Sequence, residues 1–207
     1  MRAGSWMVLG LVLALTAGPA LAQVSPNGPP PPGASGSGVT KLQGADGVIF
    51  EEVEGDGARH RLTGFICPAE LLGFERARLL VFDRSEGGRD VACTFAQGES
   101  WLTLYLTRLP GRSGEDVFAT YELQAQNAAP PTGEADAPLA AGFPPLPAFS
   151  SFWRNKAGGV DGLWMSQIGD WHIKLRVTYA PDDEAAVRAF AEALYRQIHE
   201  QVAAPEI

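Results

Sequence analysis

Several residue types are scarce in this chain, and each shortage argues against a class of function. The 207 residues include only two cysteines and three histidines. A zinc site needs a cluster of Cys, His or carboxylate ligands, but His60, His172 and His199 are far apart in the sequence. His199 does not begin an HExxH motif, because residue 203 is alanine. We therefore expect no bound metal.

Motifs that build a catalytic or cofactor site are also missing. The segment Gly98-Glu99-Ser100-Trp101-Leu102 lacks the last glycine of the GxSxG nucleophile elbow. The glycine pairs at 87–88 and 158–159 lack the spacing of phosphate-binding loops. We expect no catalytic residue and no cofactor. A hydrolase of unrecognised type is the alternative, because carboxylates are abundant and their separation in space is not visible in a sequence.

Positive charge is in deficit. The chain has 16 Lys+Arg against 24 Asp+Glu, for a formal net charge of -8. Nucleic acids and anionic lipid surfaces select basic proteins, so neither is expected as a partner. No segment after residue 22 approaches 18 unbroken apolar residues, so we expect no membrane span in the mature chain.

The first 22 residues have the pattern of a secretory signal peptide. Arg2 precedes an apolar stretch over residues 6–17, and Ala20-Leu21-Ala22 is a small-x-small cleavage site. An uncleaved membrane anchor is the alternative. We expect a periplasmic or secreted protein in which a Pro/Gly/Ser-rich linker over 23–44 precedes a single domain over 45–207.

Both cysteines, Cys67 and Cys93, lie in the expected domain. Two thiols in an oxidising compartment are expected to form a disulfide bond. A redox-active pair is the alternative, but the Cys-x-x-Cys spacing is absent. Cys93 shares the apolar face of its strand with Val91 and Phe95, so we expect the bridge to be buried.

Alternating apolar and polar residues predict a sheet-rich domain of the α+β class. Antiparallel strands are expected first, then a helix over 113–128, a Pro-rich loop over 129–147, more strands, and a C-terminal helix to about residue 202. Residues 69–74 are expected to form a helical turn or a bend. The strands are predicted at 47–54, 59–68, 77–83, 89–96, 101–108, 149–155, 161–168 and 170–180.

The last predicted strand has the clearest pattern. Trp171, Ile173, Leu175, Val177 and Tyr179 share one face, and His172, Lys174, Arg176 and Thr178 share the other. Together with the preceding strand and the final helix, residues 161–198 resemble the end of PsbP-like α/β sandwiches. Residues 76–108 resemble segments of uncharacterised secreted bacterial proteins. These resemblances imply a fold class, and they imply no particular function.

Aromatic residues gather directly after the Pro-rich loop and suggest a binding patch. We expect Trp153, Trp164 and Trp171 to form its apolar part, with Arg154 and His172 at its polar rim; a packed corner of the core is the alternative. The sequence thus predicts a non-enzymatic binding or scaffold protein of the cell envelope. A second hypothesis is a carrier of small apolar ligands, with a pocket between the sheet and the C-terminal helix near Phe190 and Leu194.

Overall fold

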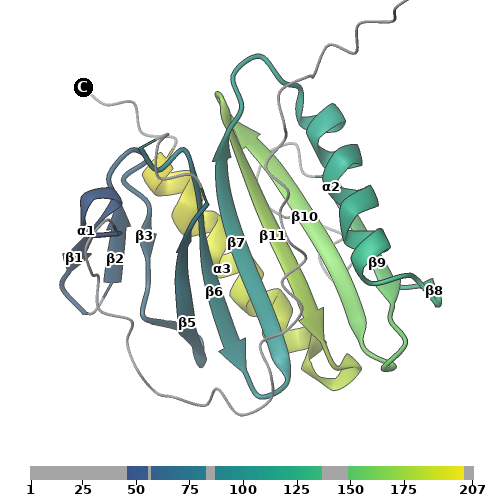
Figure 1. The fold of residues 1–207 in the computed structure, drawn as a ribbon. Coiled ribbons are helices and arrows are strands. Elements are labelled where there is room, and N and C mark those ends of the chain that lie inside the picture. The colour runs from purple at the N-terminus through teal and green to yellow at the C-terminus, as the bar shows by residue number, and fades with distance from the viewer. Residues whose placement is uncertain (1–45, 56, 83–86, 137–148, 203–207) are drawn as a thin grey trace, which may run out of the picture.

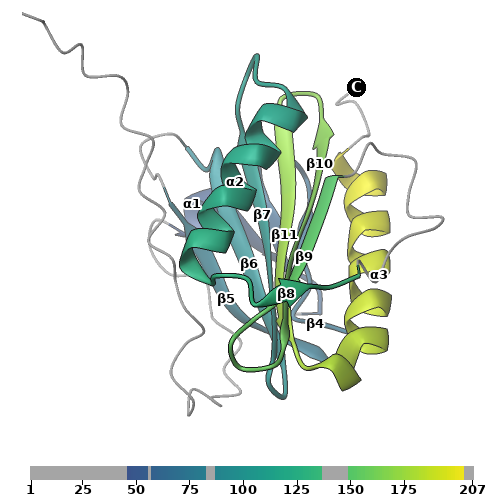
Figure 2. The same ribbon diagram turned by 90° about the vertical axis from the view of Figure 1, so that its right-hand side faces the viewer.

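The computed structural model describes residues 46–55, 57–82, 87–136 and 149–202. Over these residues the chain forms an eight-stranded antiparallel sheet with a helix on each face and a three-stranded sheet beside it (Figures 1 and 2). The predicted α+β class is confirmed. The expected signal peptide and linker lie outside the described residues, as does most of the Pro-rich loop. No helix among the described residues is long and apolar enough to cross a membrane.

The large sheet has the strand order β4-β5-β6-β7-β11-β10-β9-β8. Its last strand in sequence, β11, lies beside β7, which joins the two predicted groups of strands at the centre of the sheet. Its strands are β4 (Glu70–Leu71), β5 (Phe74–Val81), β6 (Asp90–Gln97), β7 (Ser100–Arg108), β8 (Gly133–Glu134), β9 (Phe149–Arg154), β10 (Val160–Ile168) and β11 (Trp171–Tyr179).

One face of this sheet is the main core. The register aligns Cys93, Leu104, Leu175 and Trp164 in one cross-strand row, and all four are buried. Helix α3 (Glu184–Val202) packs over this face after the 3-10 turn η1 (Pro181–Asp183). The ring of its Phe190 lies 4.8 Å from Phe74 and 5.0 Å from Phe95.

The N-terminal part forms the small sheet, and here the predicted strands were too long. Residues 47–49 belong to the helical turn α1 (Asp46–Ile49), and only β1 (Phe50–Val53) is extended. The predicted strand 59–68 is interrupted by a turn after His60, so that β2 (Gly57–His60) and β3 (Ile66–Cys67) are separate strands. The predicted disulfide is confirmed: it joins Cys67 in β3 to Cys93 in β6, and both residues are buried.

Residues 69–74 differ from the prediction as well. They form a tight hairpin between β4 and β5 rather than a helical turn. The reversal places Leu72 and Gly73 in the left-handed region, at φ values of 51° and 84°. A leucine is unusual there, and its side chain is exposed. The sequence of residues 69–74 therefore did not predict this turn.

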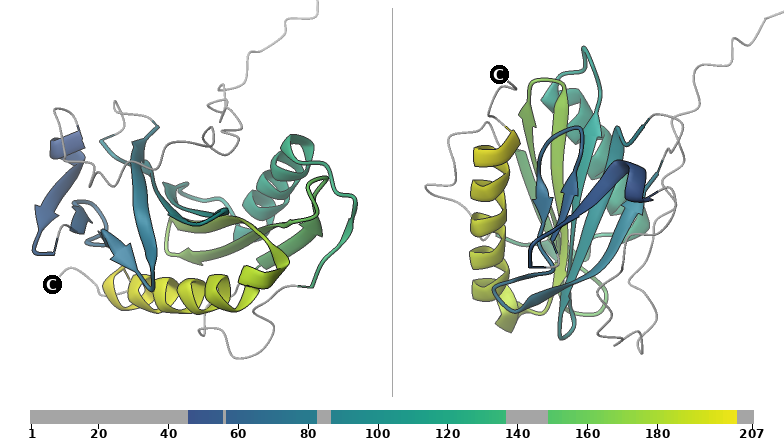
Figure 3. Two further views of the ribbon diagram at one scale, coloured as in Figure 1. Left: turned by 90° about the horizontal axis from the view of Figure 1, so that it is seen from below. Right: turned by 90° about the vertical axis from the view of Figure 1, so that its left-hand side faces the viewer.

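Helix α2 (Gly114–Ala128) covers part of the opposite face of the large sheet, next to β9 and β10 (Figure 3). The predicted helix is confirmed, and Ser113 is its N-cap, because the Ser113 hydroxyl accepts a hydrogen bond from the Asp116 amide. Val117 and Ala125 are buried on the sheet side. Figure 3 shows α2 and α3 on opposite sides of the curved sheet, with α2 nearer one end.

Candidate functional site

The face of the large sheet that lies under α2, called here the α2 face, differs chemically from the core face. One cross-strand row on it runs through Ala92, Tyr105, Lys174 and Met165. The next row contains Thr94, Thr103, Arg176 and Leu163. Polar and charged groups therefore occupy the middle of a sheet whose other side is apolar.

Lys174 is the most unusual residue of this face. Its Nζ lies 3.4 Å from the ring centroid of Tyr121 on α2 and 4.0 Å from that of Tyr105 on β7. Only 8% of the residue is exposed. Among the described residues, Nζ has neither a hydrogen bond nor an ion pair, so the two aromatic faces are its direct polar contacts.

Opposing effects act on the charge of Lys174. Burial lowers its pKa to about 7, and the nearby Arg176 acts in the same direction, while Asp90 opposes them. The two tyrosine faces also favour the ammonium form. Burial in turn raises the pKa of Tyr105 and that of Tyr121, so both rings stay neutral. Lys174 is thus an amine held near its titration point, a property common at functional sites.

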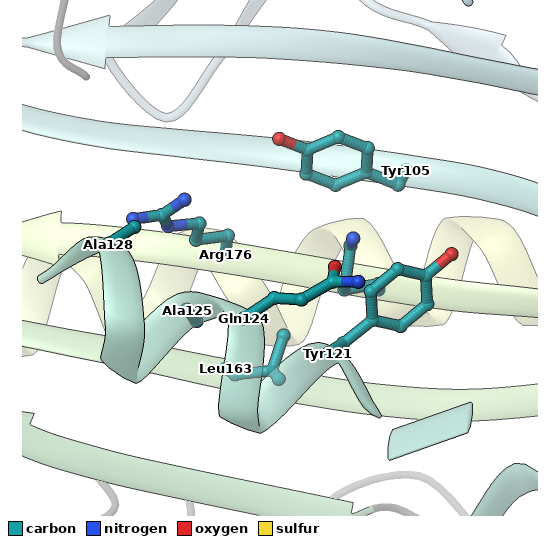
Figure 4. A pocket seen from close by; sticks show the side chains of 8 residues that line it. Tyr105, Tyr121, Gln124, Ala125, Ala128, Leu163 and Arg176 are labelled. Carbon is teal, nitrogen blue, oxygen red and sulfur yellow. The ribbon is translucent and has the colours of Figure 1, made fainter. Parts of the chain in front are cut away.

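A small cavity of about 40 Å³ lies between α2 and the large sheet (Figure 4), and Lys174 is one of its lining residues. A cavity of this volume has room for about three water-sized groups. It can therefore take one small functional group but cannot enclose a drug-sized ligand. Figure 4 shows its walls coming from α2 on one side and from the sheet on the other. The cavity is lined by Tyr105, Tyr121, Gln124, Ala125, Ala128, Leu163, Lys174 and Arg176.

Arg176 is the second cation of the cavity. It lies two residues after Lys174 on the same face of β11 and is partly exposed. In the described part of the chain its guanidinium has no ion pair and no hydrogen bond. Among the residues that the structure describes, the cavity lining contains neither a carboxylate nor a histidine. Two cations therefore share one cavity, and the described residues of its walls provide no counter-ion.

The five residues predicted as a binding patch do not form one surface. Trp164 and Trp171 lie on the core face, whereas Trp153 and His172 lie on the α2 face. Trp153 and Trp164 are 3% and 1% exposed, although a patch would require exposed indoles. Trp153 Nε1 donates a hydrogen bond to the Ala129 carbonyl, next to the end of α2. Trp153 and Trp164 therefore pack inside the protein and do not form an exposed patch.

The other two members are separated in the same way. Arg154 is exposed at the end of β9. His172 is completely buried, and burial lowers its pKa. Neither ring nitrogen of His172 has a hydrogen-bond partner among the described residues. No group of three or more His, Cys, Asp or Glu in this part of the chain could hold a metal ion.

The interface between the sheet and the C-terminal helix, considered above as a carrier pocket, is filled by side chains. Phe190 and Leu194 are fully buried, and the Phe190 ring contacts two other rings. Trp171 packs against the edge of His60, at 5.7 Å between ring centroids. The cavity described above, by contrast, lies on the α2 face.

Sequence reasoning did not select the residues of the cavity. The alternation of Lys174 and Arg176 with apolar residues gave a signal, but it is equally typical of a solvent-exposed strand face. Tyr121 lies within the helix predicted over 113–128, and nothing in the sequence marks it as part of a site. What the sequence could not show is that α2 packs across β10 and brings its tyrosine over the lysine.

Comparisons with known proteins found no family model, no curated protein and no solved structure that matches this chain.

Proposed function

We propose that this protein is an exported, non-enzymatic binding protein that binds an anionic group in the cavity beneath α2. The observation behind the proposal is that Lys174 and Arg176 line one cavity in which the described residues place no carboxylate. In a chain of net charge -8, acidic side chains that could pair with these cations are plentiful. Their absence from this cavity leaves the place open for a negative ligand.

The energetics support this reading. A buried cation is costly unless it is paired and hydrogen-bonded. The two tyrosine rings stabilise Lys174 in part, but an ammonium has three N–H donors that ring faces do not saturate. The planar guanidinium of Arg176 can grip two oxygens at once. A carboxylate or a phosphate monoester end would satisfy both cations.

A titration with simple anions tests the proposal. Protein in chloride-free buffer is titrated with sodium acetate and with inorganic phosphate, and backbone amide shifts are followed by NMR. We expect saturable shifts in α2 and β11. Lys174→Met and Arg176→Gln should each weaken binding about ten- to a hundredfold, the range for hydrogen bonds to charged groups.

Arg154→Gln is the matched control, because it removes the same charge from an exposed position at the end of β9. This variant should bind like the wild type. Equal affinity of all four proteins would place anion binding elsewhere and contradict the proposal. Amide shifts that do not saturate before the added salt itself perturbs the whole protein through ionic strength would also contradict it.

Export is the second part of the proposal, and it is supported by the leader pattern of residues 1–22 and by a buried disulfide bond. Expression of the full chain in a bacterium, followed by fractionation and mass spectrometry, tests it. We expect periplasmic protein that begins at Gln23 and lacks two hydrogens. Full-length protein in the cytosol would contradict it.

A further inference from the structure

We propose that the Lys174 amine forms a reversible imine with a small oxo acid, a ligand in which a carbonyl carbon is bonded directly to a carboxylate carbon. The inference rests on the anion-binding function proposed above, because Arg176 would hold the carboxylate. It goes further, since it gives Lys174 a covalent role and names the ligand class.

The placement of the two residues suits such a ligand. Residues two apart on one face of a strand are separated by about 7 Å between their Cα atoms. Both side chains reach the same cavity, which is lined otherwise by aromatic, aliphatic and amide groups. A ligand of this class has its electrophilic carbon next to its carboxylate. One small molecule can therefore meet the amine and the guanidinium together.

Lys174 also meets the requirements for a nucleophilic amine. Amines react with carbonyl carbons in the neutral form, and proteins favour that form by burying lysine or placing a second cation beside it. Both conditions hold here, because Lys174 is 8% exposed and Arg176 lies in the same cavity, although the nearby Asp90 favours the charged form. With a pKa of about 7, about half of Lys174 is neutral at pH 7, against about one part in 2,500 for an ordinary lysine.

The reaction is balanced without an oxidant or a reductant. The amine lone pair attacks the carbonyl carbon, and a C–N bond forms. The nitrogen loses its two protons, the carbonyl oxygen gains two, and the oxygen leaves as water. The product is an imine, and its protonated form is again a cation that keeps the contacts with Tyr105 and Tyr121.

Reductive trapping in the whole exported protein tests the proposal. Glyoxylate and sodium cyanoborohydride are added at pH 7, and peptide mass spectrometry measures the alkylation of each lysine with time. The chain has three lysines, Lys41, Lys156 and Lys174, and Lys156 is exposed in the turn between β9 and β10. We expect Lys174 to be alkylated at least about tenfold faster than Lys156. Equal or slower alkylation of Lys174 would overturn the proposal.

Two variants separate the covalent step from anion binding. Lys174→Arg keeps a cation beside the tyrosines but has no amine that forms an imine, so the trapped product at residue 174 should be lost while the exposed Lys156 is still alkylated at its wild-type rate. Arg176→Gln removes the cation beside Lys174 and should slow trapping of both aldehydes, but it should slow glyoxylate about tenfold more than acetaldehyde, which has no carboxylate. Equal slowing of the two would show that Arg176 does not hold the carboxylate. Acetate binding without trapping at Lys174 would refute the imine alone. Trapping with no effect of Arg176→Gln would refute anion binding by Arg176.

Discussion

We expect His60 to make the stability of this fold sensitive to acid, because its ring is buried between the small sheet and the large one and burial disfavours its protonated form. Its Nε2 donates a hydrogen bond to the Gly88 carbonyl at 2.8 Å, and its Nδ1 lies 2.8 Å from the Thr63 hydroxyl. A carbonyl only accepts, so Nε2 bears the proton of the neutral ring and Nδ1 accepts from Thr63. The ring is completely buried and packs edge-on against Trp171.

The magnitude follows from the protonation equilibrium. Burial lowers the pKa of His60 from 6.5 to about 4, although the hydrogen bond to Gly88 opposes the shift. Between these values the unfolded chain binds a proton that the folded chain does not, so stability falls as the pH falls. The contribution is fully present above pH 6.5 and is lost by pH 4. The difference in pKa corresponds to about 3 kcal/mol, a large part of a typical total of about 5–15 kcal/mol.

Urea unfolding at intervals between pH 7.5 and pH 4, on wild type and His60→Gln, measures this effect. Glutamine keeps an N–H donor for the Gly88 carbonyl but does not titrate. The variant should be less stable at pH 7, by about 1–3 kcal/mol for lost packing and hydrogen bonding. As the pH falls to 4, the wild type should lose about 3 kcal/mol of stability that the variant does not lose. Near pH 4 the variant should therefore be as stable as the wild type or more stable.

The comparison isolates His60, because the buried His172 and the carboxylates titrate in both proteins and cancel in the difference. Parallel pH profiles for the two proteins would refute the reasoning. They would mean that the His60 site opens or takes up a proton without unfolding.

Three further substitutions have definite expectations. Cys93→Ser removes the bond across a sequence separation of 26 residues and should lower the free energy of unfolding by about 3–4 kcal/mol; an unchanged urea midpoint would contradict this. Gly162→Ala places a Cβ against the Phe152 ring that covers this glycine and should cost about 1–3 kcal/mol, whereas a neutral effect would show that the ring can move. Lys174→Met should raise stability below pH 7 by about 1 kcal/mol or more, and a loss of similar size in thermal or urea unfolding would contradict it.

The sequence predicted the elements that are periodic over eight or more residues, including β6, β7, β10, β11 and both long helices. It predicted the small sheet poorly, and the reason is visible in the hydrogen bonds of Ile66. The Ile66 amide is bound by the Gln201 side chain, and its carbonyl accepts from the Gln197 side chain. Both partners come from α3, at the far end of the chain. No local pattern reveals that a two-residue strand will be held by helix side chains.

The candidate site was missed for a related reason. Aromatic residues close in sequence suggested a patch, but the parity of a strand separates neighbours onto opposite faces. Phe152 and Trp153 therefore point to different layers, and the register of β9 with β10 divides the cluster further. The cavity instead depends on contact between α2 and β11, elements about 50 residues apart. Periodicity identifies the face of each element but not which helix covers it.

The two faces of the large sheet make different contributions, and Lys174 distinguishes between them. The core face combines fully buried apolar side chains with the disulfide bond, so substitutions there should lower stability. On the α2 face a buried lysine forms no ion pair with any described residue, and the nearby Asp90 offsets the cost of burial only in part. Its burial is therefore unfavourable for folding at any pH where it is charged. Because its folded pKa lies below the unfolded value of 10.5, wild-type stability should rise with pH above about 7. A Lys174→Met protein that is more stable and no longer binds acetate would show the trade-off typical of a residue kept for function. If stability and binding were lost together, Lys174 would instead be a structural link between α2 and the sheet.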